Sequence, residues 1–284
     1  MSIKNESLIN FDQHELVNTN KLLLSTFKIF KEEKMEKAVL ITGASSGTGF
    51  VIAEKFAKEG YAVFISSRNE KSAEGAAEKI ISKYNTYALG LKIDSGSIAD
   101  IDTAFEKIKE SGFYLESIIL NAADLGIDMP VLTTDINDWM RVINTNLGWN
   151  FKIVQSTARI MMKHGGSIVF IGSNTSTRAI KNRSAYIASK GGINSLVKAL
   201  AVELGEYGIR VNCLAAGSIK TSRWDKLSVE NQEQKKHRVP INDIADFDDI
   251  ANAAWFLSCN MSKNITGTTL TVDGGANAQL FPNA

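Results

Sequence analysis

Short apolar runs alternate along most of this chain with longer stretches in which apolar residues recur every three or four positions. The short runs are typical of strands buried on both faces, and the longer stretches are typical of helices that bury one face. The strands expected from this pattern are Ala38–Thr42, Tyr61–Ser66, Tyr87–Ile93, Ser117–Asn121, Ile168–Ile171, Ile209–Leu214 and Thr268–Val272. The expected helices are Gly47–Lys58, Glu70–Tyr84, Ser97–Ser111, Asn137–Lys163 with a break near Asn146–Gly148, Ser184–Gly205 and Asp248–Leu257.

This order of elements predicts a parallel sheet, because strands joined through helices run in the same direction by right-handed crossovers. Helices should cover both faces of that sheet. The chain has three prolines, and neither a low-complexity linker nor an internal repeat divides it. We therefore expect an α/β fold with one domain over residues 37–284.

Residues 1–36 depart from this pattern. The first 20 are polar and contain neither glycine nor proline, and the following stretch has an apolar helical face at Leu23, Phe27 and Phe30. Acidic residues are mixed in and no small-residue cleavage site follows, which argues against a secretory signal. We expect a partly helical N-terminal arm. Two interpretations of its helix stay open: the end of a mobile arm, or a face that docks on a neighbouring subunit or covers the sheet edge.

Composition excludes several classes of function. The 284 residues carry a net charge of +1, which gives no electrostatic reason to expect nucleic acid or an anionic membrane as a partner. No apolar stretch approaches the ~20 residues that a spanning helix needs. The two cysteines, Cys213 and Cys259, form no metal-ligand motif and are typical of a reducing compartment. We therefore expect a cytoplasmic protein without a bound metal.

A tyrosine and a lysine provide the first candidate chemistry. Tyr186 and Lys190 lie four residues apart in the sequence SAYIASK, so they share one face of the expected helix. An ammonium beside a phenol favours the phenolate and lowers the phenol pKa, which suits proton exchange near neutral pH. A second hydroxyl, Ser173, ends an apolar run thirteen residues before Tyr186.

A glycine-rich turn, TGASSGTG, follows the first expected strand and opens the first helix. Its glycines allow a tight turn and the close approach of a pyrophosphate, and the helix N-terminus offers free N–H groups with a partial positive charge. The candidate nucleotide-binding residues of this turn are Gly43, Ser45, Ser46, Gly47, Thr48 and Gly49.

Taken together, these motifs resemble those of the short-chain dehydrogenase/reductases over residues 37–284. The glycine-rich turn matches their cofactor turn, and residues 265–275 resemble their C-terminal strand signature. Four residues match their catalytic tetrad in order and spacing: Asn146, Ser173, Tyr186 and Lys190. The resemblance implies a doubly wound, seven-stranded Rossmann-like sheet. It also implies hydride transfer between NAD(P)(H) and a carbonyl compound or secondary alcohol.

The resemblance also implies a role for each tetrad residue. Tyr186 would give a proton to the substrate oxygen, and Ser173 would donate a hydrogen bond to that oxygen. Lys190 would lower the pKa of Tyr186 and bind the nicotinamide ribose. Asn146 lies at the expected helix break, where a kink can hold a water that relays protons to solvent.

Cofactor preference depends on the end of the second strand. Ser67 stands where NAD-specific members carry a carboxylate, and Arg68 can pair with a 2′-phosphate, so we expect NADP(H) over NAD(H). The remaining cofactor contacts implied by the resemblance are Asp94, Ser95, Asn121, Ala122, Gly217, Ile219 and Thr221, with Tyr186 and Lys190. Three positions depart from the family pattern: Leu120 replaces an asparagine, Ala123 a glycine and Ala216 a proline.

Substrate identity stays open between a 3-oxoacyl thioester, a steroid or other alicyclic ketone, and a keto-sugar. The pocket is expected from loops 124–126, 174–180 and 222–237, the last as a mobile lid. Arg178, Lys181 and Arg183 could meet an acidic group, or form a solvated loop or subunit contacts. A homodimer or homotetramer is expected through the helix that carries Tyr186.

Two alternatives to an NADPH-dependent reductase remain. One is an NAD-dependent alcohol dehydrogenase that works in the oxidative direction. The other is a catalytically idle nucleotide-binding scaffold, against which the intact tetrad argues because a scaffold does not need a tuned tyrosine.

Overall fold

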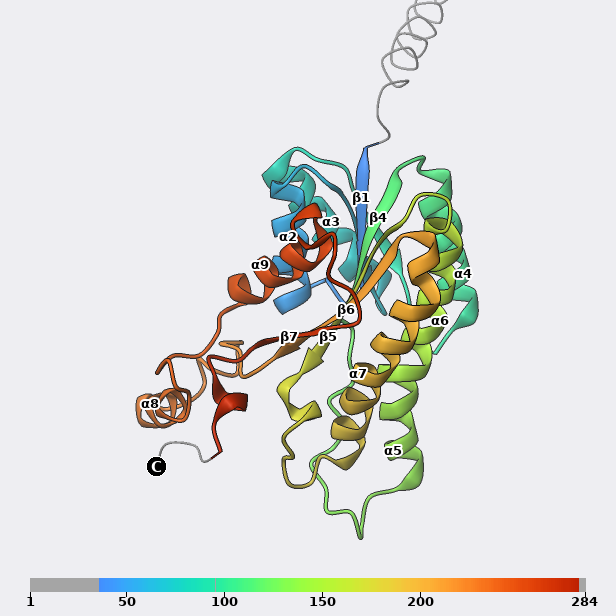
Figure 1. Cartoon of the computed structure of the whole chain (residues 1–284). Coiled ribbons are helices and arrows are strands. Elements are labelled where there is room, and N and C mark those ends of the chain that lie inside the picture. Colours follow the sequence, from blue (N-terminus) through green and yellow to red (C-terminus); the bar gives the residue numbers. More distant parts are fainter. Residues whose placement is uncertain (1–35, 95, 281–284) are drawn as a thin grey trace, which may run out of the picture. The chain divides into compact units, whose positions relative to one another are not determined.

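The computed structural model of the chain describes residues 36–94 and 96–280 (Figure 1). The expected N-terminal arm lies almost wholly outside the described residues and stays a prediction. Within the same ranges, no helix is both long enough and apolar enough to cross a membrane.

Seven strands form one parallel sheet in the order β3-β2-β1-β4-β5-β6-β7. They are β1 (Lys37–Ile41), β2 (Ala62–Ser67), β3 (Ala88–Lys92), β4 (Tyr114–Leu120), β5 (Gly166–Ser173), β6 (Ile209–Ala216) and β7 (Thr269–Val272). The chain winds outward in one direction from β1 to β3 and in the other from β4 to β7. This reversal confirms the doubly wound, seven-stranded sheet.

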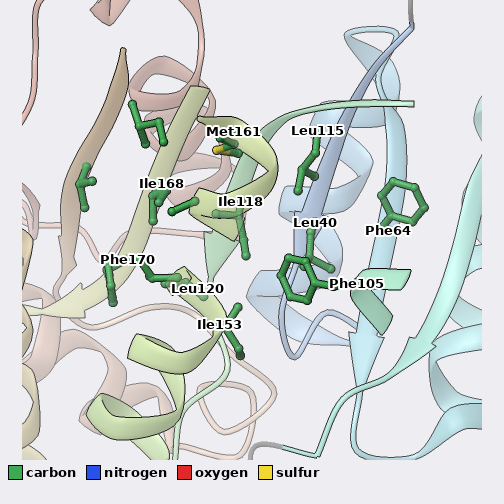
Figure 2. Close-up of a cluster of buried hydrophobic side chains, with 14 of the residues drawn as sticks. Leu40, Phe64, Phe105, Leu115, Ile118, Leu120, Ile153, Met161, Ile168 and Phe170 are labelled. Carbon is green, nitrogen blue, oxygen red and sulfur yellow. The ribbon is translucent and has the colours of Figure 1, made fainter. Parts of the chain in front are cut away.

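Helices cover both faces of the sheet (Figure 1). On one face lie α2 (Gly47–Lys58), α3 (Glu70–Tyr84) and α9 (Phe247–Ser258), and on the other α4 (Ile98–Glu110), α6 (Trp149–Met161) and α7 (Ser184–Leu204). Side chains of β1 alternate between the two layers, with Leu40 in one core and Ile41 in the other. Figure 2 shows the first core, where Phe105 of α4 and Ile153 of α6 pack with Ile118 and Phe170 of the sheet.

The expected break in the helix after β4 is confirmed. Helix α5 (Ile136–Ile143) passes through a π-helical turn, Asn144–Gly148, before α6 begins at Trp149. A π turn shifts the hydrogen-bond register by one residue and so redirects the side chains that follow.

Apart from shifts of one or two residues at element ends, the structure differs from the sequence expectation at the start of β4 and in the expected lid. Strand β4 begins at Tyr114 rather than Ser117. The charged Glu116 made this start look unlike a buried strand, but inside the fold its carboxylate is paired with Lys37 and Tyr61. Helix α8 (Val229–His237) forms within the expected lid. It buries no residue and its N-terminus is capped by Ser228, so it lacks the apolar period by which a helix is recognised.

Candidate active site

The predicted site residues gather at the carboxyl ends of the central strands. The glycine turn follows β1, Asn121 follows β4, Ser173 ends β5 and Gly217 follows β6. Because the strand order reverses between β1 and β4, their carboxyl ends flank the crevice in which open α/β sheets bind ligands.

The glycine-rich turn is packed tightly against the end of β4. Asn121 donates hydrogen bonds from Nδ2 to the carbonyl oxygens of Thr42 and Gly43, each at 3.0 Å. Thr42 Oγ1 in turn accepts from the backbone N–H groups of Asn121 and Ala122, at 3.0 and 3.1 Å. A Cβ at Gly49 would lie 2.6 Å from Asn121 Nδ2, so the turn requires glycine there. The Asn121 side chain thus supports the turn.

The N-terminus of α2 fits an anionic group. Ser46 is the N-cap residue in an extended conformation, and its side chain makes no capping hydrogen bond. The N–H groups of the first turn therefore remain available to donate hydrogen bonds to a ligand. Gly47 has a φ of 58°, and a Cβ there would meet open space, so this side of the turn has room for a phosphate. The turn and helix end together fit the pyrophosphate of a dinucleotide.

The end of β2 carries the residues expected to contact the adenosine ribose. Ser67 Oγ accepts from Ser45 Oγ at 3.4 Å and from the Asn69 N–H at 3.3 Å. Arg68 is exposed, and none of the ion pairs within residues 36–94 and 96–280 involves it. Asp94 is also exposed, and its carboxylate accepts from the Gly96 N–H at 3.1 Å. Ser95 lies outside the described residues.

Helix α7 carries Tyr186 and Lys190 beneath the end of β5. The Lys190 side chain is buried, and its Nζ donates to the Ile171 carbonyl at 2.8 Å. The same Nζ lies 5.6 Å from the centre of the Tyr186 ring, so the ammonium faces the ring. Ser173 is the last residue of β5 and is buried as well.

The pKa of Tyr186 differs from the sequence expectation. Burial raises it above the ordinary tyrosine value, and a hydrogen bond from Ser173 and the charge of Arg183 oppose that rise. The direction is opposite to the expected lowering because burial outweighs the groups that favour the phenolate, and the role of Lys190 in tuning this pKa stays a prediction. Burial also lowers the pKa of Lys190 itself to about 8.

Asn146 is enclosed in the π-helical turn and braces the loop after β4. Its Oδ1 accepts from the Asp124 N–H at 2.7 Å, and its Nδ2 donates to the Asp124 carbonyl and to Ser189 Oγ, each at 2.9 Å. Its own carbonyl accepts from Asn150 Nδ2 at 2.8 Å. The expected relay water at this kink stays a prediction.

Arg183 also supports that loop. From the sequence its role was open between a contact with an acidic group, a solvated loop and a subunit contact. Its Nη1 donates to the carbonyls of Leu125 and Gly126 at 3.1 and 3.2 Å. Arg178 likewise donates to the Ala276 carbonyl. These two members of the basic cluster therefore hold loops together, while Lys181 is exposed.

A small cavity lies on one side of Tyr186, between the loop after β4 and the start of α7. The cavity has an apolar wall formed by Leu125, Ile127, Met129, Trp139 and Val142. Arg183 and Asp138 also line it. No signal in the sequence pattern singled out Trp139, because a tryptophan on an amphipathic helix is typical of a core residue.

The loop after β6 contributes the remaining predicted contacts. A Cβ at Gly217 would lie 2.6 Å from the Cβ of Asp273, so this position also requires glycine. Ile219 pairs with Ala245 in an isolated bridge, and Thr221 Oγ1 accepts from the Arg223 N–H at 3.3 Å. No group of three or more His, Cys, Asp or Glu within the described ranges could hold a metal ion.

This arrangement combines a dinucleotide cradle with a tyrosine, a serine and a buried lysine, which defines an oxidoreductase that acts on carbonyl groups and alcohols with NAD(P). The model of a protein family described as Enoyl-(Acyl carrier protein) reductase matches residues 43–277. The chain belongs to this family, which is part of the short-chain dehydrogenases/reductases.

Relatives and solved structures agree with this membership. The chain is 34% identical over 243 residues to the 3-oxoacyl-(acyl-carrier-protein) reductase FabG of Chlamydia muridarum, covering 85% of this chain and 97% of the relative. It is 32% identical over 240 residues to the enzyme of the same name from Aquifex aeolicus, covering 84% and 96%. A gluconate 5-dehydrogenase from Burkholderia cenocepacia, solved with NADP and tartrate, superposes with a TM-score of 0.80 at 27% identity, covering 86% and 96%.

Proposed function

We propose that this chain is an NADPH-dependent reductase of 3-oxoacyl thioesters. The observation that carries carbonyl reduction is the grouping of Ser173, Tyr186 and Lys190 at the end of β5 and the start of α7. The thioester class is supported by the names of the relatives in Chlamydia muridarum and Aquifex aeolicus. The apolar wall beside Tyr186 suits an alkyl chain better than a polyol.

NADPH is favoured by charge at the end of β2. A 2′-phosphate needs a cation and is repelled by a carboxylate, and this strand ends with Ser67 and the exposed Arg68. Arg68 has no ion pair with another described residue to break, so pairing with the phosphate costs no existing contact. The neighbour from Burkholderia cenocepacia was solved with NADP, which agrees with this choice.

The mechanism assigns one task to each side chain. A nicotinamide held in this cradle would supply the hydride for the carbonyl carbon. Ser173 donates a hydrogen bond to the carbonyl oxygen and stabilises the negative charge that develops there. Tyr186 gives its proton to that oxygen, and burial, which raises its pKa, keeps the phenol protonated until transfer. The glycine turn and the N-terminus of α2 would hold the pyrophosphate.

In this mechanism Lys190 stabilises the negative charge that Tyr186 carries once it has given up its proton. Its ammonium is buried and has a carbonyl partner but no carboxylate partner among the residues described. A buried positive charge favours the phenolate that Tyr186 becomes, which helps the proton to leave. In our proposal Lys190 also binds the nicotinamide ribose, and Asn146 keeps the kink that positions this end of α7.

Initial rates test this proposal. The substrates are a 3-oxoacyl thioester, an enoyl thioester, a keto-sugar acid and an alicyclic diketone, each with NADPH and with NADH, and Tyr186→Phe is the control. We expect the wild type to turn over the 3-oxoacyl thioester with NADPH. In Tyr186→Phe the rate should fall at least about 100-fold, on the order expected for the loss of a general acid. Turnover of the enoyl thioester or the keto-sugar acid alone would contradict the proposed substrate class. Turnover of none, with NADPH still bound, would favour the idle scaffold.

Cofactor choice is tested by Arg68→Ala, with the exposed Arg159→Ala on α6 as the matched control. Loss of one charge-assisted pair should weaken NADPH binding about tenfold or more and leave NADH binding unchanged. Arg159→Ala should change neither. An equal loss of affinity for NADPH and NADH in Arg68→Ala would mean that the arginine does not bind the 2′-phosphate.

We further infer a homodimer or homotetramer that assembles through α7, in a cytoplasmic location. Helix α7 exposes apolar side chains at Ala188, Ala199 and Val202, and Val202 is 84% exposed. Such a face on a long helix suits a second copy of the same helix. The free thiols of Cys213 and Cys259 support a reducing compartment.

A further inference from the structure

Ser173 receives both of its incoming hydrogen bonds from a single neighbour. The Thr175 N–H donates to Ser173 Oγ at 3.2 Å, and Thr175 Oγ1 donates to the same atom at 2.9 Å. A hydroxyl oxygen has two lone pairs and one proton. Thr175 therefore occupies both acceptor positions of Ser173, and the serine can only donate to any third group.

The Thr175 hydroxyl is held in the donating direction. Thr175 is 8% exposed, so water competes little for it. Among the described residues its hydroxyl has no second hydrogen-bond partner, so its proton is satisfied only when it points at Ser173. The free proton of Ser173 then points away from Thr175.

Tyr186 is the titratable group whose pKa responds to Ser173. The hydrogen bond from Ser173 lowers the pKa of Tyr186, which is the effect of a donor on a phenolate. If Ser173 Oγ had a free lone pair, the Tyr186 phenol could donate a hydrogen bond to it. Such a bond would stabilise the protonated phenol rather than the phenolate.

The segment that carries Thr175 is fixed on two sides. Asn194 of α7 donates from Nδ2 to Ser176 Oγ at 2.9 Å, and Asn174 donates from Nδ2 to Asp273 Oδ2 at 3.3 Å. Since α7 also carries Tyr186, the Asn194 contact ties the Thr175 segment to the element that bears the proton donor.

We propose that Thr175 is a positioning residue that sets the direction of the Ser173 hydroxyl, so that Ser173 donates to the reacting oxygen and cannot accept from it. The inference rests on the proposed carbonyl reduction, which needs a donor at this place. A residue with a methyl group in place of the hydroxyl would free one lone pair of Ser173 and let its proton turn away from the substrate.

Three variants test this. Thr175→Val removes the hydroxyl and keeps the shape, Thr175→Ser keeps the hydroxyl, and Thr157→Val removes another buried threonine hydroxyl, on α6, that donates only to the Ile153 carbonyl. We expect Thr175→Val to lower kcat about tenfold with little change in KM for NADPH. Thr175→Ser should keep most of the wild-type kcat. Thr157→Val should keep the wild-type kcat.

A readout without turnover separates this inference from the proposed function. 3-Fluorotyrosine, incorporated at the six tyrosines, allows the Tyr186 phenol to be titrated by fluorine NMR, with Tyr186→Phe to assign its signal. Without cofactor, we expect Thr175→Val to raise the titration midpoint of this phenol by about one unit and Thr175→Ser to leave it unchanged. An unchanged midpoint and an unchanged kcat in Thr175→Val would overturn the inference. A shifted midpoint in a chain that turns over no carbonyl substrate would overturn only the proposed function.

Discussion

The side chain of Asn146 holds the backbone of Asp124 from both sides, accepting from its N–H at 2.7 Å and donating to its carbonyl at 2.9 Å. An amide side chain therefore completes the hydrogen bonding of a loop residue that belongs to no strand. Asn146 thus fixes the loop next to the cavity beside Tyr186 from inside the π-helical turn.

Removing this brace should cost both stability and activity. Asn146→Leu leaves the backbone groups of Asp124 and the hydroxyl of Ser189 without their partner, at a cost of about 2–4 kcal/mol in the free energy of unfolding. The exposed neighbour Asn144→Leu should change that free energy by less than about 0.5 kcal/mol. Urea unfolding of both variants measures the difference. Equal stability of the two would mean that the brace contributes nothing.

The lowered pKa of Lys190 predicts a pH dependence of stability. The ordinary lysine value is 10.5 and the folded value is about 8, so between these values the unfolded chain binds more protons than the folded chain. The free energy of unfolding should therefore rise with pH across this window, by about 3 kcal/mol in total from this group. Lys190→Met removes the group, and its curve should lack that rise.

The comparison is made as the difference between wild type and Lys190→Met at each pH, because other groups titrate equally in both. Lys190→Met should also be more stable than wild type at neutral pH and inactive as a reductase. A constant difference from pH 8 to pH 10.5 would show that Lys190 keeps its ordinary pKa in the fold.

Two glycines on neighbouring helices should respond to alanine with opposite signs. A Cβ at Gly49 would lie 2.6 Å from Asn121 Nδ2 and 2.7 Å from the Gly43 carbonyl, whereas a Cβ at Gly75 on α3 meets nothing within 4 Å. Gly49→Ala should destabilise the fold by about 1–3 kcal/mol and weaken cofactor binding. Gly75→Ala should stabilise it by about 0.5–1 kcal/mol and leave cofactor binding unchanged. Thermal unfolding with and without NADPH distinguishes the two.

Charge on the exposed face of α7 should break the proposed assembly. Val202→Glu places a carboxylate at a position that is 84% exposed in the single chain but would be buried between copies. Light scattering should show a smaller species for this variant. Val229→Glu on α8, at a position that is 75% exposed, should assemble as the wild type does. A monomeric wild type would exclude the assembly.

The sequence predicted the sheet because the central strands bury both faces and so appear as nearly unbroken apolar runs. It predicted the positions of Ser173, Tyr186 and Lys190 because the ends of parallel strands and one helix face bring such residues together. It could not predict that Asn146 would bind Asp124, because their meeting depends on the π-helical turn. It gave the wrong direction for the pKa of Tyr186, because spacing on a helix does not reveal how deeply a phenol is buried.

The connection between Asn174 and Asp273 has a consequence for synthesis of the chain. These two residues are 99 positions apart, and Thr177 is bonded to Asn277 across 100 positions. The loop that follows Ser173 therefore receives these supports from residues translated about a hundred positions after it. During synthesis this loop must therefore stay without two of its hydrogen-bond partners until Asp273 and Asn277 have been added.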